Sequence, residues 1–407
     1  MEPFVVNQIK YGLKELPKNY AKSYTIPKSN EKTRAMREYG FIKGVCHPDG
    51  DISLLTNANI GWIRIDIPFP FDKDGNVRER FYEFREKCRK YAEKGIKVMC
   101  VTPYPEDYID VGLDPRVKAN EQKIKEIAVF MLNELRECIG GFQITNEMGM
   151  PQFTLPLTVK EAADFIGINL EALFPVKGDI IIGYNSAGPQ ADLHSYLIPY
   201  HRYCDYVGID MYLGCFANVP GFMFMFDGMI RYLYAMTGLP VLIQEFGYIS
   251  GGAPKSDGQR KEILARYGAE SEADARAHIE EFVDKLPESL AKHVRKIGGN
   301  DPKRYGDILF NSDVTNHLYC EMPPITKIPG YDHTPEGQAK FYSHVLKRFY
   351  DMPFCCGTII YCFADSDHCY VCGQHDCPIE TRWGLVDRWL NPKPSYYAVK
   401  EQFGKLK

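Results

Sequence analysis

Eight short apolar runs recur along this chain from residue 41 onward, and segments with helical periodicity separate them. Continuous apolarity is typical of parallel strands that are buried on both faces. In the second spacer Phe81, Phe84 and Cys88 recur at spacings of three and four, as on the buried face of a helix. Strand followed by helix, eight times, predicts an α/β fold, a closed (β/α)8 TIM barrel. The predicted strands are residues 41–46, 61–66, 96–101, 141–146, 180–185, 206–211, 240–245 and 358–363.

A doubly wound open sheet is the structural alternative, but the first run is not followed by the glycine-rich phosphate turn that usually marks such a sheet. We expect a single domain over residues 1–407, with an N-terminal extension at 1–35. The interval before the last strand is too long for one helix, so residues 251–332 are interpreted as an insertion in the seventh βα loop. A cysteine-rich loop at 362–383 follows the eighth strand.

The charge balance excludes two classes of partner. Lys and Arg number 49 and Asp and Glu 53, a net charge of −4, whereas binders of nucleic acid or anionic membranes carry a basic excess. The sequence has no run of the ~20 apolar residues that a membrane span needs. The N-terminus lacks the basic start and apolar run of a secretion signal. With 13 cysteines, an odd number, the chain is expected to be cytoplasmic, its thiols reduced or bound to metal.

Two glutamates lie at the carboxyl ends of predicted strands. Glu147 follows the fourth strand and Glu245 ends the seventh. The carboxyl ends of barrel strands are where enzymes of this fold place their chemistry, and an acidic residue beside an apolar strand is costly unless it is partnered. Each glutamate alone could form an ion pair at the barrel rim. Together they supply the pair of carboxyl groups that glycoside hydrolysis requires.

Several motifs carry a resemblance to a known group of enzymes. Asn146-Glu147 after the fourth strand, Glu245 in Gln-Glu-Phe-Gly, and Trp62-Ile63-Arg64 on the second strand resemble the clan A glycoside hydrolases. Within that clan the family 5-like cellulases, mannanases and β-glycosidases look nearest. The run Trp383-Gly384-Leu385-Val386-Asp387 is similar to the tail that follows their eighth strand.

The resemblance implies a retaining double displacement, with Glu147 as general acid/base and Glu245 as nucleophile. Arg64 would favour the charged form of Glu245, and Asn146 would bind the sugar 2-hydroxyl. Tyr212, just past the sixth strand, resembles the tyrosine that holds the nucleophile in this clan, or is one more aromatic residue at the barrel rim.

The chain also departs from the clan pattern. The tryptophan usual after the eighth strand is absent, and either Phe363 or Trp383 could form the floor of the sugar site. A histidine common after the third strand is absent too, and Tyr104 stands nearby. His47, after the first strand, could reach a sugar hydroxyl or be structural.

A cluster of cysteines and histidines follows the eighth strand. Cys369, Cys372, His375 and Cys377 are ligand types that tetrahedral zinc prefers, so they predict a structural zinc site. The alternatives are free thiols, or a site completed by Cys355 or Cys356. Catalysis is expected to need no cofactor, because the two glutamates already supply a mechanism.

The predicted function is therefore hydrolysis of β-linked oligosaccharides or small glycosides. Two other classes stay open at this point. One is a non-catalytic carbohydrate-binding barrel, and the other is a metal-dependent hydrolase that works from the Cys/His cluster.

Overall fold

The computed structural model describes residues 3–48, 50–215, 222–310, 317–320, 327–375 and 377–406. Its centre is a closed barrel of eight parallel strands in chain order, in which β8 pairs with β1. This confirms the predicted TIM-barrel fold. The strands are β1 (Ile42–Cys46), β2 (Trp62–Asp66), β3 (Lys97–Val101), β4 (Gly141–Ile144), β5 (Ile181–Tyr184), β6 (Tyr206–Met211), β7 (Val241–Phe246) and β8 (Cys355–Ile360).

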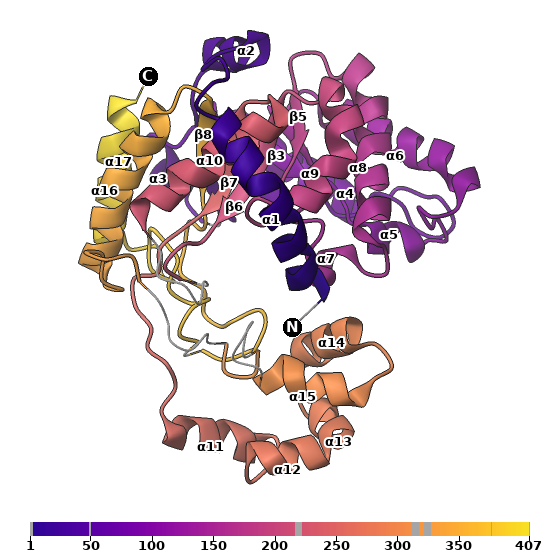
Figure 1. The fold of residues 1–407 in the computed structure, drawn as a ribbon, viewed down its shortest axis with the longest axis vertical. Coiled ribbons are helices and arrows are strands. Elements are labelled where there is room, and N and C mark those ends of the chain that lie inside the picture. Colours follow the sequence, from indigo (N-terminus) through magenta and orange to yellow (C-terminus); the bar gives the residue numbers. More distant parts are fainter. Residues whose placement is uncertain are drawn as a thin grey trace.

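Helices surround the barrel and continue into a separate group below it (Figure 1). Their buried faces follow the sequence periodicity: in α4 the side chains of Phe81, Phe84 and Cys88 pack inward. The helices are α1 (Pro3–Lys22), α2 (Glu31–Tyr39), α3 (Ile52–Asn57), α4 (Glu79–Ala92), α5 (Pro105–Ile109), α6 (Glu121–Leu135), α7 (Pro151–Thr154), α8 (Val159–Leu173), α9 (Ala191–Leu197), α10 (Met223–Thr237), α11 (Asp257–Arg266), α12 (Glu272–Ala277), α13 (Ile279–Asp284), α14 (Glu288–Gly298), α15 (Pro302–Phe310), α16 (Pro335–Asp351) and α17 (Pro394–Lys405).

The two helices that precede the barrel lie on its outside and at its base. Helix α1 contacts α9 and α10. Helix α2 is tied to the start of the sheet, where Arg37 Nε donates to the carbonyl of Pro353 at 3.1 Å. Just beyond it, the Tyr39 hydroxyl donates to the carbonyl of Gly140 at 3.3 Å. The N-terminal segment therefore packs against the amino end of the barrel, opposite the carboxyl end where a functional site is expected.

The predicted position of the last strand was wrong by three residues. The strand runs over Cys355–Ile360 rather than 358–363. Cys355 and Cys356 are buried and serve as small apolar strand residues. The chain leaves the sheet after Ile360, so Tyr361 and Phe363 belong to the loop above the barrel.

Between β7 and α16 the chain forms α11 to α15. These helices build their own hydrophobic cluster, around residues such as Leu290 and Leu309, apart from the main core. Helix α14 reaches the barrel by contacting α7 and through an ion pair of Lys296 with Glu106 on α5. The start of α16 is the one predicted from Thr334-Pro335: the Thr334 hydroxyl accepts a hydrogen bond from the Gly337 amide at 3.0 Å. Among the described residues, no helix has the length and apolarity needed to cross a bilayer.

Candidate active site

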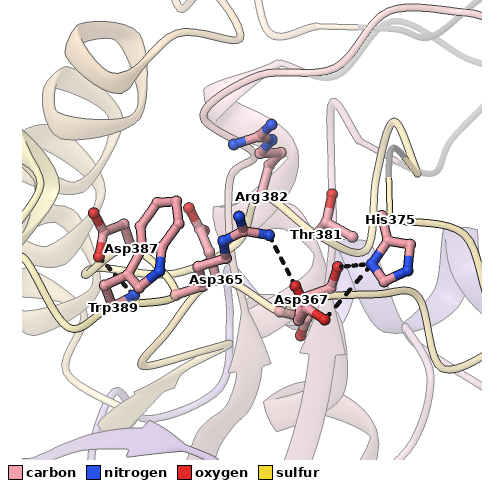
Figure 2. Close-up of a pocket in the computed structure, with 9 residues that line it drawn as sticks. Asp365, Asp367, His375, Thr381, Arg382, Asp387 and Trp389 are labelled. Atoms are coloured by element: carbon pink, nitrogen blue, oxygen red, sulfur yellow. Dashed lines mark hydrogen bonds and ion pairs between the residues drawn. The ribbon is translucent and has the colours of Figure 1, made fainter.

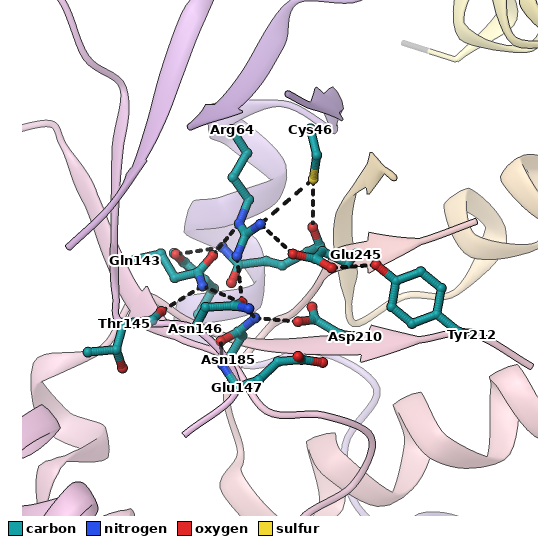
Figure 3. A network of polar contacts seen from close by, with 12 residues as sticks. Cys46, Arg64, Gln143, Thr145, Asn146, Glu147, Asn185, Asp210, Tyr212 and Glu245 are labelled. Atoms are coloured by element: carbon teal, nitrogen blue, oxygen red, sulfur yellow. Dashed lines mark hydrogen bonds and ion pairs between the residues drawn. The ribbon is translucent and has the colours of Figure 1, made fainter. Parts of the chain in front are cut away.

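Polar side chains from several barrel strands and the turns after them converge at the carboxyl end of the barrel (Figure 3). Arg64 stands on β2, Asn146 and Glu147 follow β4, and Glu245 stands on β7. Parallel strands bring their carboxyl ends to one rim, so residues far apart in sequence meet there. The network joins both glutamates singled out in the sequence.

Arg64 is the hub of this network. Its side chain is buried, with 2% of the residue exposed. Nη1 lies 2.6 Å from Glu245 Oε1, Nη2 donates to Asn146 Oδ1 at 2.6 Å, and Nε donates to Gln143 Oε1 at 2.6 Å. A buried guanidinium is costly unless its donors are paired, and here each nitrogen has an acceptor. The guanidinium group of Arg64 therefore has a fixed orientation toward Glu245.

The carboxylate of Glu245 is held on both oxygens. Arg64 contacts Oε1, and the Tyr212 hydroxyl donates to Oε2. Donors of this kind stabilise the charged form of a carboxylate more than the neutral form. The geometry thus fixes the orientation of the Glu245 carboxylate and limits its rotation.

Asn146 is oriented by its own carbonyl oxygen. Oδ1 accepts hydrogen bonds from Arg64, from Asn185 Nδ2 at 2.6 Å and from Gln143 Nε2 at 3.2 Å. Because donors converge on Oδ1, the amide cannot be flipped without losing them. Nδ2 is then the end of the side chain that can donate to a ligand.

Glu147 has the opposite electrostatic environment from Glu245. Burial, and after it the negative charge of Glu245, raises its pKa to about 8, and Arg64 offsets only part of this rise. The carboxyl group is therefore protonated at neutral pH. A protonated carboxyl beside a second carboxyl group is the arrangement that acid/base chemistry on a sugar needs.

The turn that carries Glu147 has an unusual backbone. Thr145 and Glu147 have φ values of 55° and 46°, in the left-handed region that L residues adopt at a cost of ~1–3 kcal/mol. Both amides are tied down: Thr145 N donates to Thr102 Oγ1 and Glu147 N to Asn185 Oδ1, each at 2.9 Å. The surroundings impose this conformation, which points to a positional role for the Glu147 side chain.

Asn185 after β5 and Asp210 on β6 belong to the same network but were not singled out in the sequence. Asn185 Nδ2 donates to Asp210 Oδ2 at 2.6 Å. Burial, and after it the neighbouring Glu245, raises the pKa of Asp210 well above its usual value. Asn185 ends the predicted fifth strand and Asp210 is one residue before the end of the predicted sixth, which is close to the signal that identified the two glutamates.

Aromatic side chains form the wall beside Glu245. The Trp383 ring lies 5.2 Å from the Tyr212 ring and 5.8 Å from the Tyr361 ring, both edge to face. Tyr361 is also 5.8 Å from the exposed ring of His47. Trp383 reaches this wall from the loop after β8. Phe363, the other candidate, is 1% exposed and sits in the main core.

Two further aromatic residues lie around the rim. Tyr104 stacks on Phe153 with ring centroids 5.5 Å apart, and burial raises its pKa well above the usual value. Tyr370 is 63% exposed, and the carboxyl of Glu380 is the largest cause of its raised pKa. Glu380 itself is buried, its pKa raised to about 8 chiefly by burial, and it accepts a hydrogen bond from Trp383. Glu380 had no strand-end signal in the sequence.

The cysteines and the histidine of the predicted metal cluster separate in space. Cys369, Cys372 and Cys377 come together with Cys320, not with His375. His375 is exposed, and its Nδ1 lies 2.9 Å from the Asp367 carbonyl (Figure 2). It lines a cavity of about 190 Å³ with Asp365 and Arg388. Cys355 and Cys356, the alternative ligands, lie in β8 and outside the thiol cluster.

Comparison with known proteins gives no family by sequence: no family model and no curated protein matches this chain. By structure, the chain is similar to catalytic parts of glycoside hydrolases. The GH53 catalytic domain of Ignisphaera aggregans is 18% identical, with a TM-score of 0.52 over 91% of this chain and 94% of that domain. A family 39 glycoside hydrolase of Bacteroides cellulosilyticus is 14% identical, with a TM-score of 0.52 over 89% of this chain.

A β-glucuronidase of Bacteroides uniformis is 13% identical, with a TM-score of 0.52 over 89% of this chain. This chain spans 63% of the length of the family 39 protein and 35% of that of the glucuronidase. Likeness at these identities establishes the shared barrel fold. The activity of this chain has to be argued from its own site.

Proposed function

We propose that this protein is a retaining β-glycoside hydrolase. The observation that carries the proposal is the pair of glutamates after β4 and on β7, one clamped on both oxygens by donors and the other held protonated. Arg64 and Tyr212 clamp Glu245, whereas burial and the Glu245 charge raise the pKa of Glu147 to about 8. Such a pair is what a double displacement at a sugar carbon requires.

In the first step, Glu245 attacks the anomeric carbon and forms a covalent glycosyl ester. Glu147 gives its proton to the departing glycosidic oxygen as that bond breaks. The ester neutralises Glu245, and the largest electrostatic cause of the raised Glu147 pKa is then lost.

In the second step, Glu147 takes a proton from water, and the hydroxide oxygen displaces Glu245 from the anomeric carbon. The product keeps the anomeric configuration of the substrate. The oriented Nδ2 of Asn146 is suited to bind the sugar 2-hydroxyl, a contact that strengthens in the transition state. Tyr104, Tyr361, Trp383 and His47 would form the walls of the sugar site.

We propose a β-linked oligosaccharide or small glycoside as substrate, in line with the β-glucuronidases among the structural neighbours. No metal takes part in the proposed chemistry. None of the 13 cysteines forms a disulfide, which fits a reducing compartment, and we propose a cytoplasmic location.

The experiment begins with a panel of aryl β-glycosides. NMR of the first-formed product should show the anomer of the substrate, and an inverted product would refute the assignment of Glu245 as nucleophile. Glu147→Gln and Glu245→Gln should each lower turnover by orders of magnitude, with circular dichroism unchanged. Exposed Glu93 provides the matched control, Glu93→Gln, with normal turnover expected. If both site variants bind and turn over sugar as the wild type does, the site is not catalytic as proposed.

A further inference from the structure

Four cysteine sulfurs meet where the loop after β8 passes residues 317–320. The Sγ atoms of Cys320, Cys369, Cys372 and Cys377 all lie within 4.8 Å of one another, and all four residues are buried. The sulfurs of Cys320 and Cys369 are 3.6 Å apart. A disulfide needs about 2.05 Å, whereas sulfurs around a zinc ion with Zn–S bonds of about 2.3 Å lie roughly 3.8 Å apart.

The backbone around these sulfurs is arranged to serve them as acceptors. The amides of Val371 and Cys372 donate to Cys369 Sγ at 3.3 and 3.4 Å, and the amide of Glu380 donates to Cys377 Sγ at 3.3 Å. A thiol sulfur is a weak acceptor, so three backbone donors on two sulfurs are an arrangement suited to thiolate ligands of a metal ion.

The turn that brings Cys369 and Cys372 together is closed by glycine. Gly373 has a φ of 69°, in the left-handed region, and its amide donates to the Cys369 carbonyl at 2.9 Å. A residue with a side chain would be strained there. The tight turn lets both sulfurs point to the same side.

The fourth cysteine, Cys320, belongs to the segment that follows helices α11 to α15, whereas the other three lie in the loop after β8. Cys320 itself has a φ of 52°, a left-handed conformation that a cysteine adopts at a cost. Gln374 fixes its segment by donating from Nε2 to the Leu318 carbonyl at 2.7 Å. The buried hydrogen bond holds the segment in place, so that Cys320 keeps its strained backbone conformation beside the other three cysteines.

We propose that Cys320, Cys369, Cys372 and Cys377 bind one zinc ion as four thiolates. The thiol protons are released to solvent on binding. Four protein ligands fill a tetrahedral shell and leave no open position, which is the mark of a structural rather than a catalytic zinc. His375 is no ligand in this assignment, which corrects the ligand set expected from spacing.

The ion would join two parts of the molecule that otherwise have separate cores. Cys320 follows the helices α11 to α15, and the other three ligands lie in the loop after β8. Beside the ligands, Val371 packs against both hydrophobic clusters. The same loop carries Tyr370 and Glu380 to the rim of the candidate active site, so the zinc would fix that rim.

The first test is the metal itself. Protein purified without added chelator should contain one zinc per chain by elemental analysis. X-ray absorption should show four sulfurs at about 2.3 Å and no nitrogen at about 2.0–2.1 Å. Iron in place of zinc, a nitrogen ligand, or no metal after reconstitution with reduced protein and zinc would overturn the proposal. So would disulfides among the four cysteines in protein prepared under reducing conditions.

Variants separate the two ligand sets. Cys320→Ala should lose the zinc, while His375→Ala should keep one zinc per chain. The matched control is Cys204→Ala, another buried cysteine outside the cluster, which should also keep it. Zinc retained at one per chain in the Cys320 variant would refute the assignment. If that variant does not fold, loss of zinc in the folded His375 variant would refute it equally.

Discussion

Glu147→Gln should change stability in a way that depends on pH, because the carboxyl is buried and protonated. In the folded state its pKa is raised from 4.5 to about 8. At about 1.4 kcal/mol per tenfold change in proton affinity, this shift corresponds to about 5 kcal/mol, of which about 4 kcal/mol is lost by pH 8. Between these two pH values the unfolded chain releases the proton and the folded chain keeps it, so ionisation favours unfolding.

The stability attached to Glu147 is therefore fully present below pH 4.5 and is lost as the pH rises to about 8. Glutamine has nearly the same shape and no proton to lose. The variant should match the wild type near pH 4 and exceed it by up to ~4 kcal/mol near pH 8.

Urea unfolding followed by tryptophan fluorescence at several pH values measures this difference. Glu93→Gln on the surface should show no such pH trend. A Glu147 variant whose advantage is constant with pH, or grows toward acid, would show that Glu147 is not a buried protonated acid.

Three other predictions concern the same network. Arg64→Met should lose activity and destabilise the fold by about 3–5 kcal/mol, because it removes the ion-pair partner of buried Glu245. Calorimetry checks this, and the double variant with Glu245→Gln should regain stability. Tyr212→Phe removes the hydrogen bond to the Glu245 carboxylate, and such a bond is worth ~1.5–3 kcal/mol. We therefore expect kcat/KM to fall roughly tenfold to hundredfold with the fold intact. Unchanged kcat/KM would exclude a role of Tyr212 in holding Glu245. The value of kcat/KM should fall above about pH 8, because Glu147 then loses its proton. This basic limb of the pH profile should be absent in Glu147→Gln assayed with a leaving group that needs no protonation. A basic limb that persists in the variant would belong to another residue.

The barrel could be predicted because its signal is periodic. Apolar runs and helical spacers repeat, and only a few folds bury such a pattern. The edge of the last strand was misplaced because a run of apolar residues continues past the sheet. Tyr361 and Phe363 are as apolar as strand residues, and Cys355 and Cys356 were not counted as part of the strand.

The two glutamates could be found because position on a strand end is readable from sequence. Asn185 and Asp210 carried the same signal, but a polar residue ending a strand becomes informative only when its partners are known. The oriented amide of Asn146 and the pKa of Glu147 depend on distances that arise from barrel closure.

Cys320 lay beyond sequence reasoning for a different reason. It is 49 residues from Cys369, and the intervening helix α16 and strand β8 belong to the barrel. Spacing alone favoured His375, which is near in sequence but turns to Asp367 instead. Glu380 could not be predicted for a similar reason: it lies in the loop after β8, where no strand end or residue spacing marks it as a site residue.

In the proposed mechanism Glu245 becomes covalently bound to the sugar. A 2-deoxy-2-fluoro derivative of whichever aryl β-glycoside the enzyme hydrolyses should form a stable glycosyl ester, and peptide mass spectrometry locates it. We expect one added sugar per chain, on Glu245, and none in Glu245→Gln. A label on Glu147 or Glu380, or labelling that persists in Glu245→Gln, would contradict this mechanism.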